Sequence, residues 1–151
     1  MAGKKKMKME LSITPMKPGE KRPSPVPDRR LYDLLGEQGI RDMINQQYDL
    51  LAESEIKDLF PPAGPGLEMA KQHSADYIIQ RFGGPAMYNE RRGKPMLINR
   101  HKDFKINVRA REVWLECYRE ALLKQDIPDD LKLSFWNFFD SFSNWLVNIE
   151  E

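Results

Sequence analysis

The sequence predicts an all-α protein built as one domain. Apolar residues recur at three- and four-residue spacings from Leu31 onward, and no segment alternates apolar and polar residues as a strand would. Clusters of glycine and proline divide the helical stretches. No internal repeat or heptad seam with complementary flanking charges is visible. A length of 151 residues suits a single domain with a core of ordinary size.

The first two predicted helices lie in residues 31–51. Gly36 and Gly39 mark a break between a short helix and a longer one. A corner follows at residues 59–66, because its three prolines and two glycines fit no regular element. The third helix is expected from about Leu67 to Phe82, where Gly83-Gly84-Pro85 ends it.

Two further helices are predicted in the last third of the chain. The apolar positions from Val108 to Leu123 mark a fourth helix, which ends before Pro128. Asp129 is expected to cap a fifth, long helix. Its apolar residues recur every three or four positions from Leu131 to Ile149, as on a helix with one buried face.

Composition and charge describe a soluble globular protein. Apolar residues make up 40% and charged residues 31% of the chain, and no apolar run approaches the roughly 20 residues of a membrane span. Lys4-Lys5-Lys6 precedes Met, Lys and Glu, where a secretory signal would need an apolar segment. Cys117 is the single cysteine, which excludes an internal disulfide and fits a reducing compartment. We therefore expect a cytoplasmic protein.

Residues 1–30 differ from the rest of the chain. They hold nine Lys or Arg residues against three acidic ones, a net charge of +6, so that the remainder carries −5 within the total of +1. Five of the eleven prolines also lie here. We expect a disordered, basic, proline-rich extension that keeps the protein soluble, followed by the folded domain at residues 31–151. No aromatic residue is interleaved with the lysines, so no nucleic-acid partner is expected.

The chemistry that the sequence can carry centres on its two histidines. Phosphate-binding glycine loops between a strand and a helix are absent, and no cysteine pair could hold zinc. His101 follows a loop rich in glycine and proline, and it precedes Phe104 and Ile106. A single imidazole does not retain a metal alone, whereas a haem also buries a large apolar area, worth about 25 cal/mol per Å². An ordinary, partly buried histidine is the alternative.

The residues around His101 resemble the group II truncated haemoglobins. Phe82-Gly83-Gly84-Pro85 matches the end of that family's helix E, and Tyr88-Asn89-Glu90 with Gly93-Lys94-Pro95 matches the loop that follows. Arg100-His101-Lys102-Asp103-Phe104-Lys105-Ile106 matches the segment that contains the proximal haem ligand. Trp114 and Gln47-Tyr48-Asp49 match the family's distal tryptophan and tyrosine. The resemblance covers about residues 31–149.

The resemblance implies a two-over-two helical sandwich that encloses a b-type haem. His101 would ligate the iron through one ring nitrogen, and its other N–H is expected to bond a backbone carbonyl or a weak acceptor, which keeps the imidazole neutral. Tyr48 and Trp114 would donate hydrogen bonds to a bound gas. Ala70 corresponds to the family's small gate residue, and Ser74 stands where relatives usually have Leu or Gln. Without the His101 match, Tyr48 and Trp114 would be interpreted as core residues.

The remaining site expectations concern the edge of the haem. Phe60 lies near the corner where globins press an aromatic ring onto the porphyrin, and Phe104 is expected beside the haem. Arg92 and Arg100, with Tyr88 behind them, are candidates to bind the propionates; the alternative is ordinary surface charge. His73 should lie at the edge of the pocket, where it would ligate, bind a propionate, carry protons or simply face solvent.

Three functions from different classes fit this site. The first is tight, reversible binding of O₂, and of other gases such as NO or CO, by a carrier, scavenger or sensor. The second is a redox enzyme that oxidises nitric oxide with bound O₂ or reduces peroxide, and it would need a separate electron donor. The third is a helical interaction protein without haem. We expect the first, with the second as the alternative, in a protein that is a monomer or a homodimer.

Overall fold

The computed structural model describes residues 10–18 and 20–150, and within them all regular structure is helical. The prediction of an all-α protein is thereby confirmed. The helices are α1 (Arg30–Leu51), α2 (Pro65–Arg81), α3 (Met87–Arg92), α4 (Leu97–His101), α5 (Val108–Leu123) and α6 (Asp129–Phe142), with two short 3₁₀ turns at Lys57–Leu59 and Ser143–Leu146. None of the helices in this described part combines the length and the apolar character that a membrane crossing needs.

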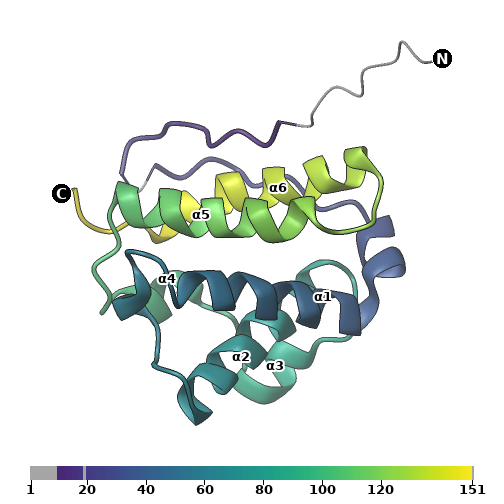
Figure 1. The fold of residues 1–151 in the computed structure, drawn as a ribbon, viewed down its shortest axis with the longest axis horizontal. Helices are drawn as coiled ribbons and strands as arrows, with labels where there is room; N and C mark the ends of the chain where they lie inside the picture. Colours follow the sequence, from purple (N-terminus) through teal and green to yellow (C-terminus); the bar gives the residue numbers. More distant parts are fainter. Residues whose placement is uncertain (1–9, 19, 151) are drawn as a thin grey trace.

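The four long helices form two layers. Helix α1 packs on α2 and on α5, and α5 packs on α6. Figure 1 shows α5 and α6 side by side in one layer, with α1, α2 and the short helices α3 and α4 below them. This arrangement is the predicted sandwich of two helices over two. The segment between α2 and α5, which contains His101, lies below α5 and α6 in this view (Figure 1).

Aromatic side chains of α6 fill the core between the layers. Phe135, Phe138 and Phe139 are all at most 2% exposed, as the apolar spacing of this helix predicts. Tyr118 of α5 stacks on Phe139 with ring centroids 4.3 Å apart, and Phe82 meets Phe135 edge-on at 4.7 Å. Such pairs contribute roughly 0.5–1.5 kcal/mol each beyond the area they bury. The aromatic cluster therefore holds α5 and α6 against the end of α2.

Helix α1 contains the break that its glycines predict. Gly36 adopts φ 66° and ψ 178°, which separates a short helical stretch at residues 30–35 from the long remainder of α1. Left-handed φ values of this kind favour glycine, which has no Cβ to clash. Gly39 continues inside the helix, so the break lies at Gly36 alone. The remainder of α1 presents Tyr48 to the space between the layers, where the residue is 7% exposed.

The end of the chain differs from the sequence prediction in two respects. Asp129 is the first residue of α6 rather than its cap, since Pro128 holds the cap position and no side-chain cap bond forms. The helix also ends at Phe142, not near Ile149, because the backbone beyond it pairs with the segment before α5. Asn148 donates its N–H to the Ile106 carbonyl at 2.9 Å, and the Ile106 N–H donates to the Asn148 side chain at 2.9 Å.

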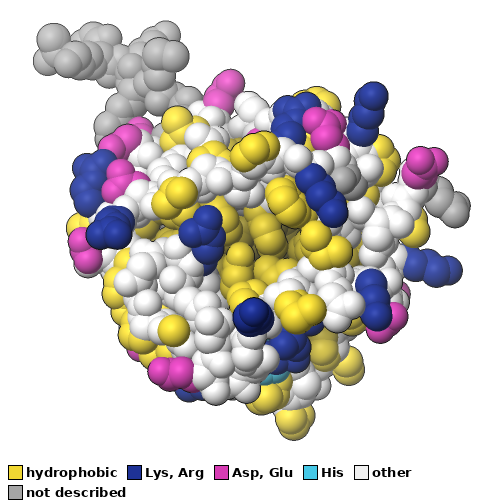
Figure 2. Space-filling view, turned by 180° about the vertical axis from the view of Figure 1, so that it is seen from behind, with side chains coloured by type: hydrophobic (Ala, Val, Ile, Leu, Met, Phe, Trp, Pro, Cys, Tyr) yellow, Lys and Arg dark blue, Asp and Glu magenta, His cyan; other side chains and the backbone are white. Residues whose placement is uncertain are grey.

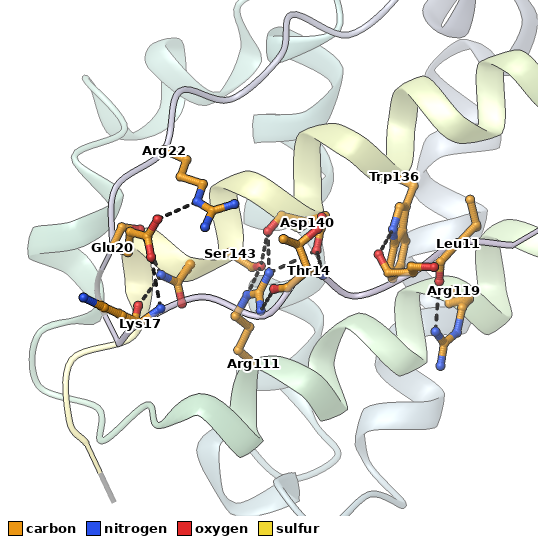
Figure 3. A network of polar contacts seen from close by, with 12 residues as sticks. Leu11, Thr14, Lys17, Glu20, Arg22, Arg111, Arg119, Trp136, Asp140 and Ser143 are labelled. Carbon is orange, nitrogen blue, oxygen red and sulfur yellow. Dashed lines mark hydrogen bonds and ion pairs between the residues drawn. The ribbon is translucent and has the colours of Figure 1, made fainter.

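Residues 10–18 and 20–29 form a strap along α5 and α6, whereas the sequence predicted a disordered extension (Figure 3). The N–H and the hydroxyl of Thr14 both donate to the Asp140 carboxylate, at 2.8 and 2.5 Å. The Trp136 indole N–H donates to the Ser12 carbonyl at 2.8 Å, and Leu11 is 3% exposed. Buried polar groups on α6 thus find their partners in the strap. The expectation for residues 1–9 lies outside the described residues.

Candidate functional site

A cavity of about 400 Å³ lies between the two layers, and Figure 2 shows its mouth as a hollow lined by hydrophobic side chains. This volume falls within the roughly 300–1,000 Å³ of pockets that hold small molecules and cofactors. The wall includes all ten residues that the sequence singled out, together with His73. The ten are Tyr48, Phe60, Ala70, Ser74, Tyr88, Arg92, Arg100, His101, Phe104 and Trp114.

His101 is the last residue of α4, and its ring is fixed by a local hydrogen bond. Its Nδ1 lies 2.7 Å from the Leu97 carbonyl oxygen, one helical turn earlier. Because a carbonyl oxygen only accepts, Nδ1 carries the proton and Nε2 keeps a lone pair. The ring is half-buried, and the Phe104 ring lies beside it with centroids 6.4 Å apart. His101 is therefore set up to give one neutral nitrogen to a metal.

Tyr48 and Ser74 form a hydroxyl pair across the cavity wall. The Tyr48 and Ser74 hydroxyl oxygens lie 2.6 Å apart, which joins α1 to α2. One of the two O–H groups is used in this bond, so one hydroxyl proton of the pair remains for a third partner. Burial raises the pKa of the Tyr48 phenol, and the bond to Ser74 lowers it in part. The phenol stays protonated at neutral pH and can serve as a donor.

Aromatic rings and one small residue complete the wall beside this pair. The Phe60 ring meets the Tyr48 ring edge-on, with centroids 5.6 Å apart. The Trp114 indole packs against Tyr118 and Phe139, with centroids 4.7 and 5.5 Å away. No hydrogen bond joins the Trp114 N–H to another residue in the described ranges, so a ligand in the cavity can accept from it. Ala70 adds only a methyl group to the wall.

The mouth of the cavity carries cationic groups around Tyr88. The Arg100 guanidinium donates to the Pro95 and Arg92 carbonyls at 2.8 and 2.9 Å, which fixes its orientation. Arg100 and Arg92 both lie over the Tyr88 ring, at 5.7 and 5.9 Å from its centroid. Burial, followed by the charge of Arg92, lowers the pKa of His73. This edge suits carboxylate groups, while His73 is kept neutral.

Sequence reasoning missed one charged residue of the wall, Arg111. This residue is 3% exposed and donates to the Ser143 hydroxyl, the Asp140 carbonyl and the Asp140 carboxylate, at 3.0, 2.6 and 3.0 Å. Burial lowers the pKa of Arg111, while the Asp140 carboxylate opposes that effect. The pair could have been predicted from two charged residues on apolar helix faces. Arg111 lies on the apolar face of α5, and Asp140 lies on the apolar face of α6.

The donors present fit a haem rather than a bare metal ion. No group of three or more His, Cys, Asp or Glu residues that could hold an ion occurs in residues 10–18 and 20–150. A lone imidazole retains iron only when a macrocycle supplies the other four ligands and buries its own apolar surface. The cavity offers aromatic walls for such a ring, Nε2 of His101 for its iron and arginines for its carboxylates.

Known globins are similar to this chain in sequence. The model of a family described as bacterial-like globin matches residues 30–148. Group 2 truncated hemoglobin 3-1 of Lotus japonicus is 32% identical over 126 residues, which cover 81% of this chain and 74% of the relative. Two-on-two hemoglobin-3 of Arabidopsis thaliana is also 32% identical over 126 residues, covering 81% of this chain and 71% of the relative.

Solved structures share the fold. Phosphate-bound Hell's gate globin IV superimposes with a TM-score of 0.83 at 30% identity, over 93% of this chain and 88% of that one. The hemoglobin of Chloroflexus aurantiacus gives a TM-score of 0.73 at 32% identity, over 85% of this chain and all of that one. The chain therefore belongs to the bacterial-like globin family, and within it to the group II truncated haemoglobins.

Proposed function

We propose that this protein holds a b-type haem through Nε2 of His101 and binds O₂ tightly on the other side of the ring, as a carrier, scavenger or sensor. The globin family implies the haem and a diatomic ligand. The observation that carries the proposal is the pairing of two features in one cavity. A histidine with a free Nε2 and a hydroxyl pair with one spare proton both line its wall.

The proximal side sets the protonation of the imidazole. The Nδ1–H donates to the Leu97 carbonyl, which fixes the tautomer and leaves Nε2 as the ligating atom. The haem, when bound, supplies a ferrous iron that takes a diatomic gas. His101 comes from α4, a helix of five residues between two loops. The position of this nitrogen therefore depends on how residues 93–107 pack against the chain end, where the Asn148 side chain donates to the His101 and Phe104 carbonyls.

The distal side supplies hydrogen bonds to the gas. Hydrogen-bond donors near the outer atom of a diatomic ligand would stabilise it and slow its release. The Tyr48 and Ser74 pair supplies one O–H, and Trp114 supplies an indole N–H with no other partner in the described chain. Each bond contributes about 1 kcal/mol, and more where charge develops on the ligand. Two donors favour slow release, which suits storage, scavenging or sensing better than bulk transport.

The mouth holds the polar end of the haem. Arg92 and Arg100 are placed over Tyr88 and are proposed to bind the propionates, with Phe60 and Phe104 against the ring. Arg100 already donates through Nε and Nη2 to backbone carbonyls, so its remaining N–H groups are the ones open to a carboxylate. Neutral His73 at the same edge adds a group that can give or take a proton.

Haem uptake tests the ligand assignment. Purified chain is titrated with hemin, and the Soret band and the ferrous-CO spectrum are recorded. We expect tight uptake by the unsubstituted protein. His101→Ala should lose the five-coordinate histidine spectrum, because it removes the imidazole that the Leu97 carbonyl orients. His73→Ala is the matched control and should keep the spectrum. An unchanged spectrum in His101→Ala would show that the ligand is wrongly assigned.

The redox enzyme is the alternative to a binding protein, and kinetics separate the two. The oxygenated protein is mixed with nitric oxide and, separately, the ferric protein with peroxide, in a stopped-flow instrument. Reaction with nitric oxide far faster than O₂ dissociation, repeated over many cycles with a reductant, would favour the enzyme. For a binding protein we expect slow O₂ release and no sustained turnover when the reductant is added. A cytoplasmic location and a monomer or homodimer stay predictions from the sequence.

A further inference from the structure

The outer surface of residues 91–105 is cationic and lies beside the mouth of the cavity. This segment contains six Lys or Arg residues and only one acidic residue, Asp103. It comprises the end of α3, the loop after it, α4 and the start of the connection to α5. Figure 2 shows Lys and Arg side chains around the apolar hollow. A field of one sign beside an opening attracts partners of the other sign.

Three of these six cations neither make an ion pair nor line the cavity within the part of the chain that the structure describes. Arg91 pairs with the buried Asp76 at 2.9 Å, and Arg92 and Arg100 line the cavity. Lys94, Lys102 and Lys105 are exposed, and no ion pair within residues 10–18 and 20–150 includes them. Solvated lysines of this kind contribute little to folding. Their charge remains available to a partner even when the haem carboxylates neutralise Arg92 and Arg100.

Two exposed apolar side chains lie among these lysines. Met96 is 61% and Ile98 is 43% exposed, while Leu97 between them lines the cavity. Met96 also adopts φ 44°, the one positive φ among the described non-glycine residues. Such strained residues cluster at functional sites. Phe104 is exposed as well, but it lines the cavity and is counted with the haem pocket.

Exposed apolar side chains together with charged ones are typical of a protein interface. The surface made by Lys94, Met96, Ile98, Lys102 and Lys105 is called the docking surface below. It lies on the segment that carries His101 and that contributes Arg92 and Arg100 to the cavity wall, so a protein bound there would lie near the proposed haem. Neither a free phosphate nor a nucleic acid would use the two exposed apolar side chains.

We propose that the docking surface receives a small acidic electron-transfer protein of the ferredoxin type. This inference rests on the proposed haem. The reduced [2Fe–2S] cluster of the partner loses one electron, and the ferric iron held by His101 gains it and becomes ferrous; no bond forms and no proton moves. Redox complexes of this kind bury less than about 1,200 Å² and form quickly through electrostatic attraction. A patch of three lysines and two apolar residues suits such a brief contact.

The test uses the haem-loaded protein and a plant-type [2Fe–2S] ferredoxin as the probe. Reduced ferredoxin is mixed with the ferric globin under CO, and formation of the ferrous-CO spectrum gives a second-order rate constant. Calorimetry with oxidised ferredoxin gives the affinity without any reaction. The variant Lys102→Glu/Lys105→Glu is compared with Lys124→Glu/Lys132→Glu, which changes the net charge equally near the C-terminal end of α5, where Lys132 of α6 donates to the Leu123 carbonyl at 3.2 Å.

We expect the first variant to lower the rate constant and the affinity by about tenfold at low salt, and the control by less than about twofold. High salt should remove the difference, because it screens exposed charges. Equal effects in both variants would overturn the proposal, since net charge alone would then explain them. Sedimentation that shows globin dimers broken by Lys102→Glu/Lys105→Glu would also overturn it. Unchanged haem spectra in both variants separate these results from failure of the haem proposal.

Discussion

At the scale of single residues, the proposed hydrogen bond to the gas depends on which of Tyr48 and Ser74 donates to the other. The two hydroxyl oxygens are 2.6 Å apart, and either can donate to the other. If Ser74 donates, the phenol proton of Tyr48 is free for the gas; if Tyr48 donates, the serine proton is free. Relatives with Leu at this position have no such choice. In the proposed site, Ser74 would orient the phenol and share with Tyr48 the donation of a hydrogen bond to the gas.

Substitution of this pair should change the release of O₂. We expect Tyr48→Phe to raise the O₂ dissociation rate about fivefold, which corresponds to one hydrogen bond of about 1 kcal/mol. Ser74→Ala should have a smaller effect, because it frees the phenol but no longer orients it. Stopped-flow displacement of O₂ by CO measures the rates. Tyr77→Phe removes another phenol of the cavity wall and is the control. Equal rates in all four proteins would contradict the distal network.

His73 makes the stability of the protein sensitive to acid. Its pKa is lowered below the ordinary 6.5, by burial first and then by Arg92. A depressed pKa means that the folded protein disfavours the charged imidazole, so this contribution is present above pH 6.5 and is lost as the pH falls through the folded value. We expect the free energy of unfolding to fall between pH 6.5 and 5, and to fall less in His73→Gln. Urea titrations at each pH measure the difference, and parallel curves would refute the assignment.

At the scale of elements, the turn between α2 and α3 sets the direction in which the chain leaves α2 toward His101. Gly83 adopts φ 101°, which suits glycine. Gly84 is constrained by its neighbours instead. A Cβ at this residue would lie 2.6 Å from the Tyr32 ring and 2.8 Å from the Ile79 side chain. The close approach holds the start of α1 against the end of α2.

A methyl group at this turn should therefore destabilise the protein. We expect Gly84→Ala to lower the free energy of unfolding by about 1–3 kcal/mol, the usual cost of overpacking, since a ring and a branched side chain must both move. Chemical denaturation of the haem-free and the haem-bound protein measures it. Pro85→Ala changes an exposed neighbour and is the control. A stability equal to that of the unsubstituted protein would show that Tyr32 can move aside freely.

At the scale of the whole molecule, the strap connects the chain's beginning to the wall of the cavity. Arg111 lines the cavity and donates to the Thr14 carbonyl at 3.0 Å, and Arg119 donates to the Leu11 carbonyl at 2.9 Å (Figure 3). The Asn144 side chain donates to the Lys17 and Glu20 carbonyls, both at 2.8 Å. Removal of the strap would take away the carbonyl acceptors of Arg119 and of the buried Asn144, and would leave Arg111 as the remaining donor to the Asp140 carboxylate.

Deletion of residues 1–26 should weaken both the fold and the hold on haem. Each buried group left without its partner costs about 1–3 kcal/mol, so we expect a clearly lower unfolding midpoint. Loosening of Arg111 should also speed transfer of hemin to an acceptor globin. Thermal unfolding and absorbance at the Soret band measure the two effects. Val26→Ser, in an exposed strap residue, is the control. A truncated chain with the midpoint and hemin loss of the full protein would show that the strap contributes nothing.

Much of the site could be predicted because its residues lie in ordered local motifs. Phe82 to Pro85, Tyr88 and the Arg100 to Ile106 segment follow one another in a fixed order, and His101 bonds to Leu97 within one turn of helix. The helical spacing likewise predicted α2 and α5 closely, since local periodicity reports which face is buried. The hydrogen bond between Tyr48 and Ser74 could not be predicted from local patterns, because the two residues are 26 positions apart.

The sequence by itself determined an all-α protein, its main helices, a break near Gly36 and Gly39, and ten of the residues that line the cavity. These features depend on local spacing, glycine and proline, or on motifs in chain order. Only the tertiary structure decided that residues 10–18 and 20–29 form a strap, that α6 ends at Phe142 and that Arg111 is buried against Asp140. The physical reason is that each depends on a polar or apolar partner about 30 to 130 residues away, whose position is set by the packed layers and by no local pattern.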